Sequence, residues 1–227
     1  MTGTNDATTA EQHRLAAVSS IAAAAARHVG ELAELRAAEL PEPLTRLGAP
    51  PRWRMANLTG SPVAPARVLV CGQHPDGSWD GCETIRAFGF SGALPAGVVH
   101  ANADCTLRGL AAEHLTAGAL AAPPAATAVR SSGTFTAAGR RYWAQFSTYL
   151  ANPIPPARGL LLEHSVVTDA ASRAGLGEDI TNLSNAIHHA FLTCAADHTF
   201  ADSPGQTHGV ELKRGPHQRI SRDRHRD

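Results

Sequence analysis

The feature that most constrains this chain is a long alanine-rich stretch near its start, over residues 9–40. Large apolar residues recur there at steps of three and four, the spacing that places them on one face of an α-helix. A capping-box pattern begins at Thr8, and Pro41 is a residue at which helices stop. The pattern predicts one long amphipathic helix whose alanine-rich face suits close packing against other helices.

Four further segments show helical spacing of apolar residues, and prolines separate several of them. The predicted helices cover residues 105–120, 137–150, 160–174 and 179–196. A short β-branched run, Val68–Cys71, fits a buried strand and the end of a helix equally well. Together these patterns predict a mainly α fold, organised as a single helical domain over residues 9–212.

The two ends of the chain differ in composition from this domain. Residues 1–8 are polar and are expected to be disordered. Residues 213–227 are rich in arginine, with Ile220 as the only large apolar side chain, so they cannot bury enough surface to become ordered. A basic disordered tail of this kind can bind polyanions, although such tails are more often simply solvated ends.

Composition argues against several classes of function. The 20 basic residues balance the 20 acidic ones, so no overall field attracts the chain to nucleic acid or to a membrane. The sequence offers no window of about 18 uninterrupted apolar residues and no basic leader before its first apolar run. The four cysteines form no CxxC pair and are expected to be free thiols. We expect a cytoplasmic protein that binds neither nucleic acid nor membrane, and a homo-oligomer is compatible with the sequence.

Among residues that can act as catalysts or metal ligands, histidine is unusually abundant, with 12 in the chain. None of the spacings gives HExxH or a His/Cys zinc framework, so a zinc hydrolase is poorly supported. Three histidines gather on or beside the last predicted helix: His188, His189 and His198. An imidazole that faces an apolar surface suits a heme axial ligand as well as an ordinary core position, and both interpretations stay open.

Two other segments carry candidate site residues. The segment Ala66–Gly92 surrounds a Gly–Asp turn with polar and aromatic side chains and presents His74, as a loop at a site does. His100 follows an apolar pair and precedes Asp104, which can cap the next helix. His100 therefore fits either a base that lines a pocket or the plain start of a helix.

Three parts of the chain resemble the heme-dependent L-tyrosine 3-hydroxylases. The similarity lies in residues 26–53, in CGQHPDGSWDGCETIRAFGFSG (71–92) and in HANADCTLRGLAAEHL (100–115), so it covers the first half of the chain better than the second. These enzymes make L-DOPA for the propyl-proline units of lincomycin, hormaomycin and pyrrolobenzodiazepine antibiotics. The resemblance implies a monooxygenase of antibiotic biosynthesis that acts on a small aromatic amino acid.

The resemblance also implies a fold, a cofactor and site residues. The fold would be α-helical with a histidine-ligated heme b, akin to tryptophan 2,3-dioxygenase, and peroxide would drive hydroxylation of the phenol ring. His74 or His100 would be the distal acid/base. Arg86 or Arg108 would hold the substrate carboxylate, since a fork of donors suits that group. The axial ligand would be one of three histidines: His188, His189 or His198.

Two alternatives stay open beside this resemblance. Gln73, Gly77 and Trp79 have the spacing of the QW element of terpenoid cyclases, so the chain could be a fragment of an α/α toroid. No second element of this kind and neither of the acidic motifs DxDD and DDxxD is present in the sequence. The alanine-rich helices equally suit a helical binding protein that is not an enzyme.

Overall fold

The computed structural model describes residues 20–56, 65–75, 77–124, 126–153 and 158–196, and its main element is an antiparallel β-sheet. Its eight strands are β1 (Leu32–Glu34), β2 (Arg54–Met55), β3 (Arg67–Gln73), β4 (Trp79–Phe90), β5 (Glu113–Ala119), β6 (Ala126–Ala137), β7 (Arg140–Ala151) and β8 (Gly159–Asp169). They run in the order β2-β3-β4-β8-β7-β6-β5, and β1 pairs with the far end of β4. The prediction of a mainly α, single helical domain is therefore wrong for the described residues.

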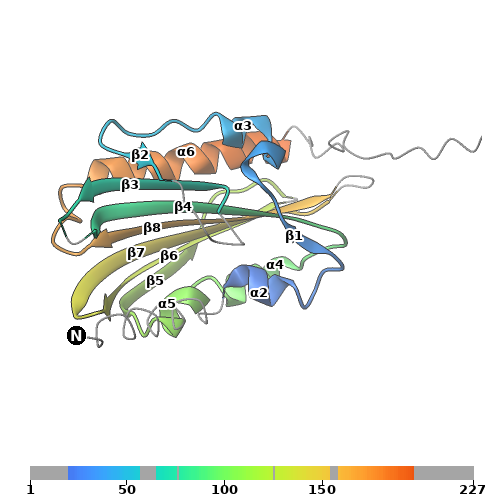
Figure 1. Cartoon of the computed structure of the whole chain (residues 1–227). Coiled ribbons are helices and arrows are strands. Elements are labelled where there is room, and N and C mark those ends of the chain that lie inside the picture. Colours follow the sequence, from blue (N-terminus) through green and yellow to red (C-terminus); the bar gives the residue numbers. More distant parts are fainter. Residues whose placement is uncertain (1–19, 57–64, 76, 125, 154–157, 197–227) are drawn as a thin grey trace, which may run out of the picture.

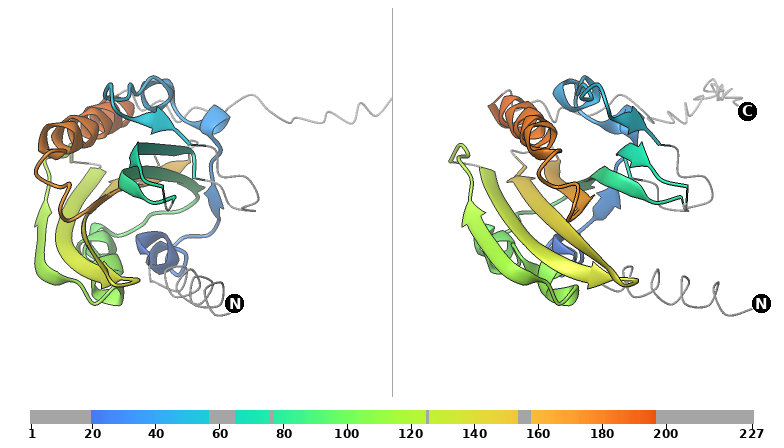
Figure 2. Two further views of the ribbon diagram at one scale, coloured as in Figure 1. Left: turned by 60° about the vertical axis from the view of Figure 1, so that its left-hand side comes forward. Right: turned by 90° about the vertical axis from the view of Figure 1, so that its left-hand side faces the viewer.

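Helices lie on both faces of this twisted sheet (Figures 1 and 2). One face carries α3 (Glu42–Thr45) and the long α6 (Gly177–Ala196). The other face carries α2 (Ile21–Ala25), α4 (Ala96–Ala101) and α5 (Cys105–Gly109). A single 3₁₀ turn, η1 (Ala37–Glu39), precedes α3. Of the described helices, none is long and apolar enough to cross a bilayer.

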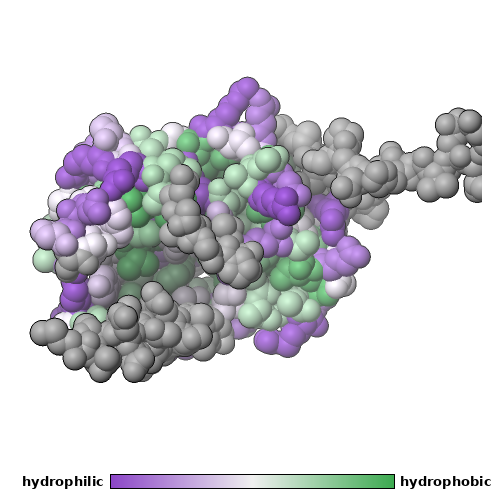
Figure 3. Space-filling view, in the orientation of Figure 1, coloured by the Kyte–Doolittle hydropathy of each residue, from purple (hydrophilic) through white to green (hydrophobic). Residues whose placement is uncertain are grey.

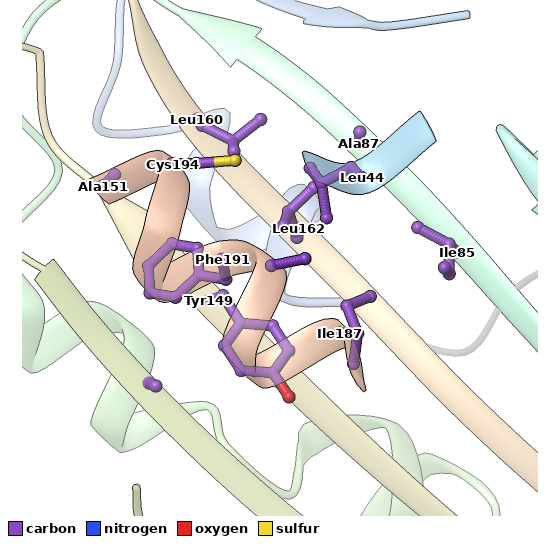
Figure 4. Close-up of a cluster of buried hydrophobic side chains, with 12 residues drawn as sticks. Leu44, Ile85, Ala87, Tyr149, Ala151, Leu160, Leu162, Ile187, Phe191 and Cys194 are labelled. Atoms are coloured by element: carbon purple, nitrogen blue, oxygen red, sulfur yellow. The ribbon is translucent and has the colours of Figure 1, made fainter. Parts of the chain in front are cut away.

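The core beneath α6 confirms the predicted helix over residues 179–196. Its predicted apolar stripe is buried: Ile180, Leu183, Ile187, Phe191 and Cys194. Figure 4 shows Ile187 and Phe191 among side chains of β4, β7 and β8, including Tyr149 and Leu162. Burying side chains of this size contributes about 1.5–3 kcal/mol each, so this cluster fixes α6 on the sheet.

The helices predicted over residues 137–150 and 160–174 are instead the strands β7 and β8. Where the two strands are covered on both faces, at Tyr149–Ala151 and Gly159–Leu162, their sequences are continuous apolar runs rather than alternating ones. Leu160 and Leu162 face α6, whereas Leu161 between them packs on the α2/α4 face. A continuous run of this kind cannot be assigned to helix or strand from periodicity alone.

The two remaining helix predictions are largely wrong as well. In the described part of 9–40, α2 ends at Ala25 and β1 follows; residues 9–19 lie outside the described residues. In 105–120, α5 ends at Gly109 and β5 begins at Glu113. Ala111, between them, has a left-handed φ of 52°, a conformation that no continuous α-helix contains.

The QW spacing belongs to a β-hairpin and not to a helical toroid. Gln73 and Trp79 are cross-strand partners at the end of β3 and β4. Gly77 has a φ of 80°, which the turn between them requires and which glycine adopts without strain. Arg54 donates to Gln73 at 2.8 Å and lies over the Trp79 ring, 4.8 Å from its centroid. The cyclase-like toroid is therefore overturned together with the α fold.

Candidate ligand-binding cavity

A polar cavity of about 360 Å³ lies between the sheet and the layer formed by α2, α4 and α5. Its volume falls within the range of small-molecule sites, about 300–1,000 Å³. Both hydrophobic (green) and hydrophilic (purple) residues are visible on the face of the molecule in Figure 3. The sheet contributes Thr84, Arg86, Phe146, Ser147, Thr148, Glu163, His164 and Ser165, and the helical layer contributes Ser20, Ile21, Ala23, Ala103 and Thr106.

Strand register builds the floor of this cavity as two rows of cross-strand neighbours. In the first row Glu163 of β8 lies between Arg86 of β4 and Thr148 of β7. In the second row, two residues further along, Ser165 lies between Thr84 and Phe146. Because side chains alternate along a strand, both rows project from the same face of the sheet.

The hydroxyl groups of Thr84 and Ser165 are 2.7 Å apart and hydrogen-bond to each other. One proton is used in this bond, so the pair keeps one further donor and several lone pairs for a bound molecule. The opposite wall is anchored as well, because the Ser131 hydroxyl donates to the carbonyl of Ala103 at 2.7 Å. Polar groups that are held in this way offer a ligand a fixed pattern of donors and acceptors.

Arg86 is fixed by a carboxylate beside the cavity. Its Nε and Nη2 donate to the two carboxylate oxygens of Glu34, at 2.8 and 3.1 Å. Its guanidinium also lies 4.9 Å from the centroid of the Phe88 ring. The bond to Glu34 raises the pKa of Arg86 further, so this side chain stays charged. The bidentate pair uses two of the five N–H donors of Arg86.

Glu163 is the second carboxylate of the cavity. Its Oε1 accepts a hydrogen bond from the backbone N–H of Ala22 at 2.9 Å, which ties β8 to α2. Its Oε2 lies 3.7 Å from Nη1 of Arg86, beyond hydrogen-bond distance. Burial raises the pKa of Glu163, and the Ala22 N–H and the charge of Arg86 offset this only in part. With Glu34 and Glu163 ionised, the three charged groups sum to one negative charge.

A buried network of hydrogen-bonded polar side chains lies on the opposite face of the sheet, directly behind this floor. Arg67 Nε donates to Glu83 Oε2 at 2.9 Å, and His164 Nε2 lies 3.2 Å from Glu83 Oε1. Arg67 also donates to the carbonyls of Leu47 and Gly48, at 2.6 and 2.7 Å. These hydrogen bonds fix the segment after α3 to the sheet. They also link β4 to β8, the two strands that support the cavity.

A second hollow, of about 380 Å³, lies between α6 and the loop 48–51. Asp179 on its rim already accepts hydrogen bonds from the indole N–H of Trp53 and from Arg52. Its other lining residues, apart from Glu178 and Asn182, are glycine, alanine, proline and leucine. This hollow therefore offers a ligand a poorer set of fixed polar groups than the first cavity.

The sequence-predicted residues do not meet at one place. Arg86 lines the cavity, whereas Arg108 lies on α5 and pairs with Asp104 at 2.6 Å. His74 lies in the β3–β4 turn, where its Nε2 is 3.0 Å from Asp80 Oδ1. His100 is exposed on α4. These assignments of role stay predictions, but of the four only Arg86 belongs to the cavity.

The predicted axial histidines lie on the other side of the sheet or outside the described residues. His188 packs on Tyr149, with ring centroids 5.8 Å apart, and burial lowers its pKa. Its Nδ1 is buried without a hydrogen-bond partner within the described part of the chain. His189 is exposed on α6, and His198 falls outside the described residues.

These positions do not fit a heme held between the predicted residues. The sheet separates His100 on α4 from His188 on α6, so the two cannot face one another across one macrocycle. Within the described ranges, no group of three or more His, Cys, Asp or Glu side chains is placed to hold a metal ion. The expectation of an all-α protein is thus overturned by its fold, and heme b stays a prediction. Hydroxylation of L-tyrosine stays a prediction that none of these observations tests.

Sequence reasoning missed most of the cavity, because much of its floor lies on β7 and β8, which were predicted as helices, and the rest lies on β4, which was interpreted as part of a loop. The missed residues are Thr84, Thr148, Glu163 and Ser165. The usable signal was an alternation of period two: Glu163 and Ser165 alternate with apolar and buried neighbours along β8.

Comparison with solved structures gives a likeness in fold, and LpqN is one of the structures that match. Neither a protein-family model nor a curated protein sequence matches the chain. The crystal structure of LpqN, involved in cell envelope biogenesis of Mycobacterium tuberculosis, is similar with a TM-score of 0.47 and 16% sequence identity. The match covers 69% of this chain and 82% of LpqN. A likeness at this level carries no inference about function.

Proposed function

We propose that this protein binds a small polyhydroxylated molecule, neutral or cationic, in the cavity between the sheet and α2, α4 and α5. The observation that carries the proposal is the pair of cross-strand rows on its floor, Arg86–Glu163–Thr148 and Thr84–Ser165–Phe146. Hydroxyl groups donate and accept at once, so they match ligands that do the same.

The chemistry of the rows favours a sugar-like ligand. Carboxylate and hydroxyl oxygens can accept from neighbouring ligand hydroxyls, and the ring of Phe146 offers an apolar surface for C–H groups. A cavity with a few fixed polar groups and an apolar wall is the usual form of a small-molecule site. These features support a binding protein, although not the helical one that was an alternative from the sequence.

The charges of the cavity argue against an anionic ligand. Arg86 is already paired with Glu34, and Glu163 adds a carboxylate that a ligand carboxylate would have to approach. Like charges in a partly desolvated site repel one another strongly. A free amino acid bound through its carboxylate therefore suits this cavity less well than a neutral or cationic molecule.

Saturation-transfer NMR with D-glucose tests this proposal. We expect saturation transfer to D-glucose and a weaker signal with D-glucuronate, which has the same ring and a negative charge. Thr84→Val keeps the shape of the side chain and removes its hydroxyl, so it should weaken D-glucose binding about fivefold, the value of one hydrogen bond of roughly 1 kcal/mol.

Thr116→Val is the matched control. Thr116 and Ser132 form the same kind of cross-strand hydroxyl pair, at 2.8 Å, outside the cavity on β5 and β6. This variant should bind D-glucose as the wild type does. The proposal is wrong if no saturation transfer occurs to D-glucose, or if both valine variants bind it equally well.

A further inference from the structure

Two carboxylates lie at the cavity, Glu163 in its lining and Glu34 beside it, but only one described arginine, Arg86, and this excess of negative charge bears on the kind of ligand that the cavity binds. Arg86 and Glu34 neutralise one another through two hydrogen bonds. Glu163 is not part of that pair, since 3.7 Å separates its Oε2 from Nη1 of Arg86. One carboxylate group of the cavity therefore has no directly bonded cation among the described residues.

Glu163 lines the cavity and accepts hydrogen bonds from the backbone N–H of Ala22 and from the hydroxyl of Ser20. Oε1 is fixed by the N–H of Ala22, and the side chain, which lines the cavity, is only 18% exposed. An ionised carboxylate can accept about four hydrogen bonds. The charged or titratable groups near it are Arg86 on β4, Glu34 on β1 and the thiol of Cys105 on α5, and of these only Arg86 is a cation.

We infer, resting on the proposed function, that Glu163 recognises a protonated amine on the polyhydroxylated ligand, so that the cavity prefers an amino sugar or amino alcohol to its neutral counterpart. The ammonium donates to the carboxylate of Glu163, and Thr148, its neighbour on β7, offers a further acceptor. A charge-assisted hydrogen bond in a desolvated place is about twice as strong as a neutral one.

This arrangement couples binding to pH. Burial raises the pKa of Glu163, and the side chain cannot attract an ammonium while it is protonated. As the pH rises through that pKa, the carboxylate forms and binding of the amine strengthens. The affinity for a neutral sugar should change little over the same range. The preference should therefore grow as the pH rises from acid toward neutrality, a range in which the amine itself stays largely protonated.

Titration calorimetry with D-glucosamine and D-glucose tests the inference. The wild type should bind D-glucosamine about tenfold more tightly than D-glucose at neutral pH, the value of one hydrogen bond to a charged group. Glu163→Gln keeps an oxygen for the N–H of Ala22 but loses the charge, so it should bind the two sugars equally. The control Glu31→Gln, at an exposed carboxylate paired with Arg158, should keep the preference.

The outcomes separate this inference from the proposed function. Equal binding of the two sugars by the wild type, or a preference that survives Glu163→Gln, overturns the role of Glu163 and leaves sugar binding intact. Binding of neither sugar overturns both. If Glu163→Gln fails to fold, the pH series on the wild type decides: a preference that does not rise with pH contradicts the inference.

Discussion

Removal of the Glu83 carboxylate tests the most deeply buried electrostatic interaction of this fold. Glu83→Gln keeps the size of the side chain but removes the charge that faces Arg67 and His164. The side chains of Arg67 and Glu83 are only 10% and 2% exposed, so the guanidinium would stay buried without its counter-ion. We expect the free energy of unfolding to fall substantially.

The size of the expected loss in the free energy of unfolding depends on the hydrogen bonds that Arg67 keeps in the variant. Breaking a buried ion pair by removing one partner costs about 3–5 kcal/mol. Arg67 retains its hydrogen bonds to the carbonyls of Leu47 and Gly48, which places the expected loss near the lower end, at about 3 kcal/mol. For a chain of this length such a loss lowers Tm by about 6–12 °C.

Urea denaturation followed by circular dichroism measures this loss. The slope of the transition should stay the same, because the surface exposed on unfolding does not change. Glu42→Gln is the matched control, since Glu42 pairs with Arg46 at 68% and 76% side-chain exposure. Exposed pairs of this kind contribute about 0–1 kcal/mol. A loss below about 1 kcal/mol in Glu83→Gln would refute the reasoning that Arg67 depends on this carboxylate.

Three further changes have definite expected results. Tyr149→Phe should leave unfolding unchanged or raise its free energy by up to about 1 kcal/mol, because the buried hydroxyl has no hydrogen-bond partner within the described ranges; a clear loss in urea denaturation would show that it has one. Glu163→Gln should stabilise the protein at neutral pH: with its folded pKa raised by burial, the wild type loses stability as pH rises through the unfolded and then the folded pKa. The stability curves of wild type and variant should converge in acid, and curves that stay parallel across the pH range contradict this. Burial raises the pKa of Cys82 to about 11, so iodoacetamide should alkylate it slowly near neutral pH; mass spectrometry that finds it modified as fast as free cysteine would contradict that pKa.

The outcome of the sequence predictions depended on how each element is covered. Helix α6 has one buried stripe and one exposed face, so its period of 3.6 was visible and its prediction is confirmed. The strands β7 and β8 are packed on both faces, so their apolar runs carried no alternation that separates a strand from a helix. The aromatic and β-branched residues of these runs, such as Tyr149 and Val166, favoured strands, but short-range propensity is a weak signal.

The candidate site was predictable only at Arg86. A segment rich in glycine and polar residues, Ala66–Gly92, was interpreted as a loop at a site, and it forms a hairpin whose strand β4 does reach the cavity. The turn with His74 lies at the end of that hairpin and does not line the cavity. Glu163 and Thr148 come to Arg86 through strand register, a long-range pairing that no local pattern in the sequence specifies.

The location of the ligand is the central claim, and amide chemical-shift mapping tests it most directly. Titration of the ¹⁵N-labelled protein with D-glucosamine should shift the amides of Thr84, Arg86, Thr148, Glu163 and Ser165, and should leave those of His188 and His189 on the opposite face unchanged. Shifts that concentrate on α6, or no shifts at all, would contradict a binding site between the sheet and α2, α4 and α5.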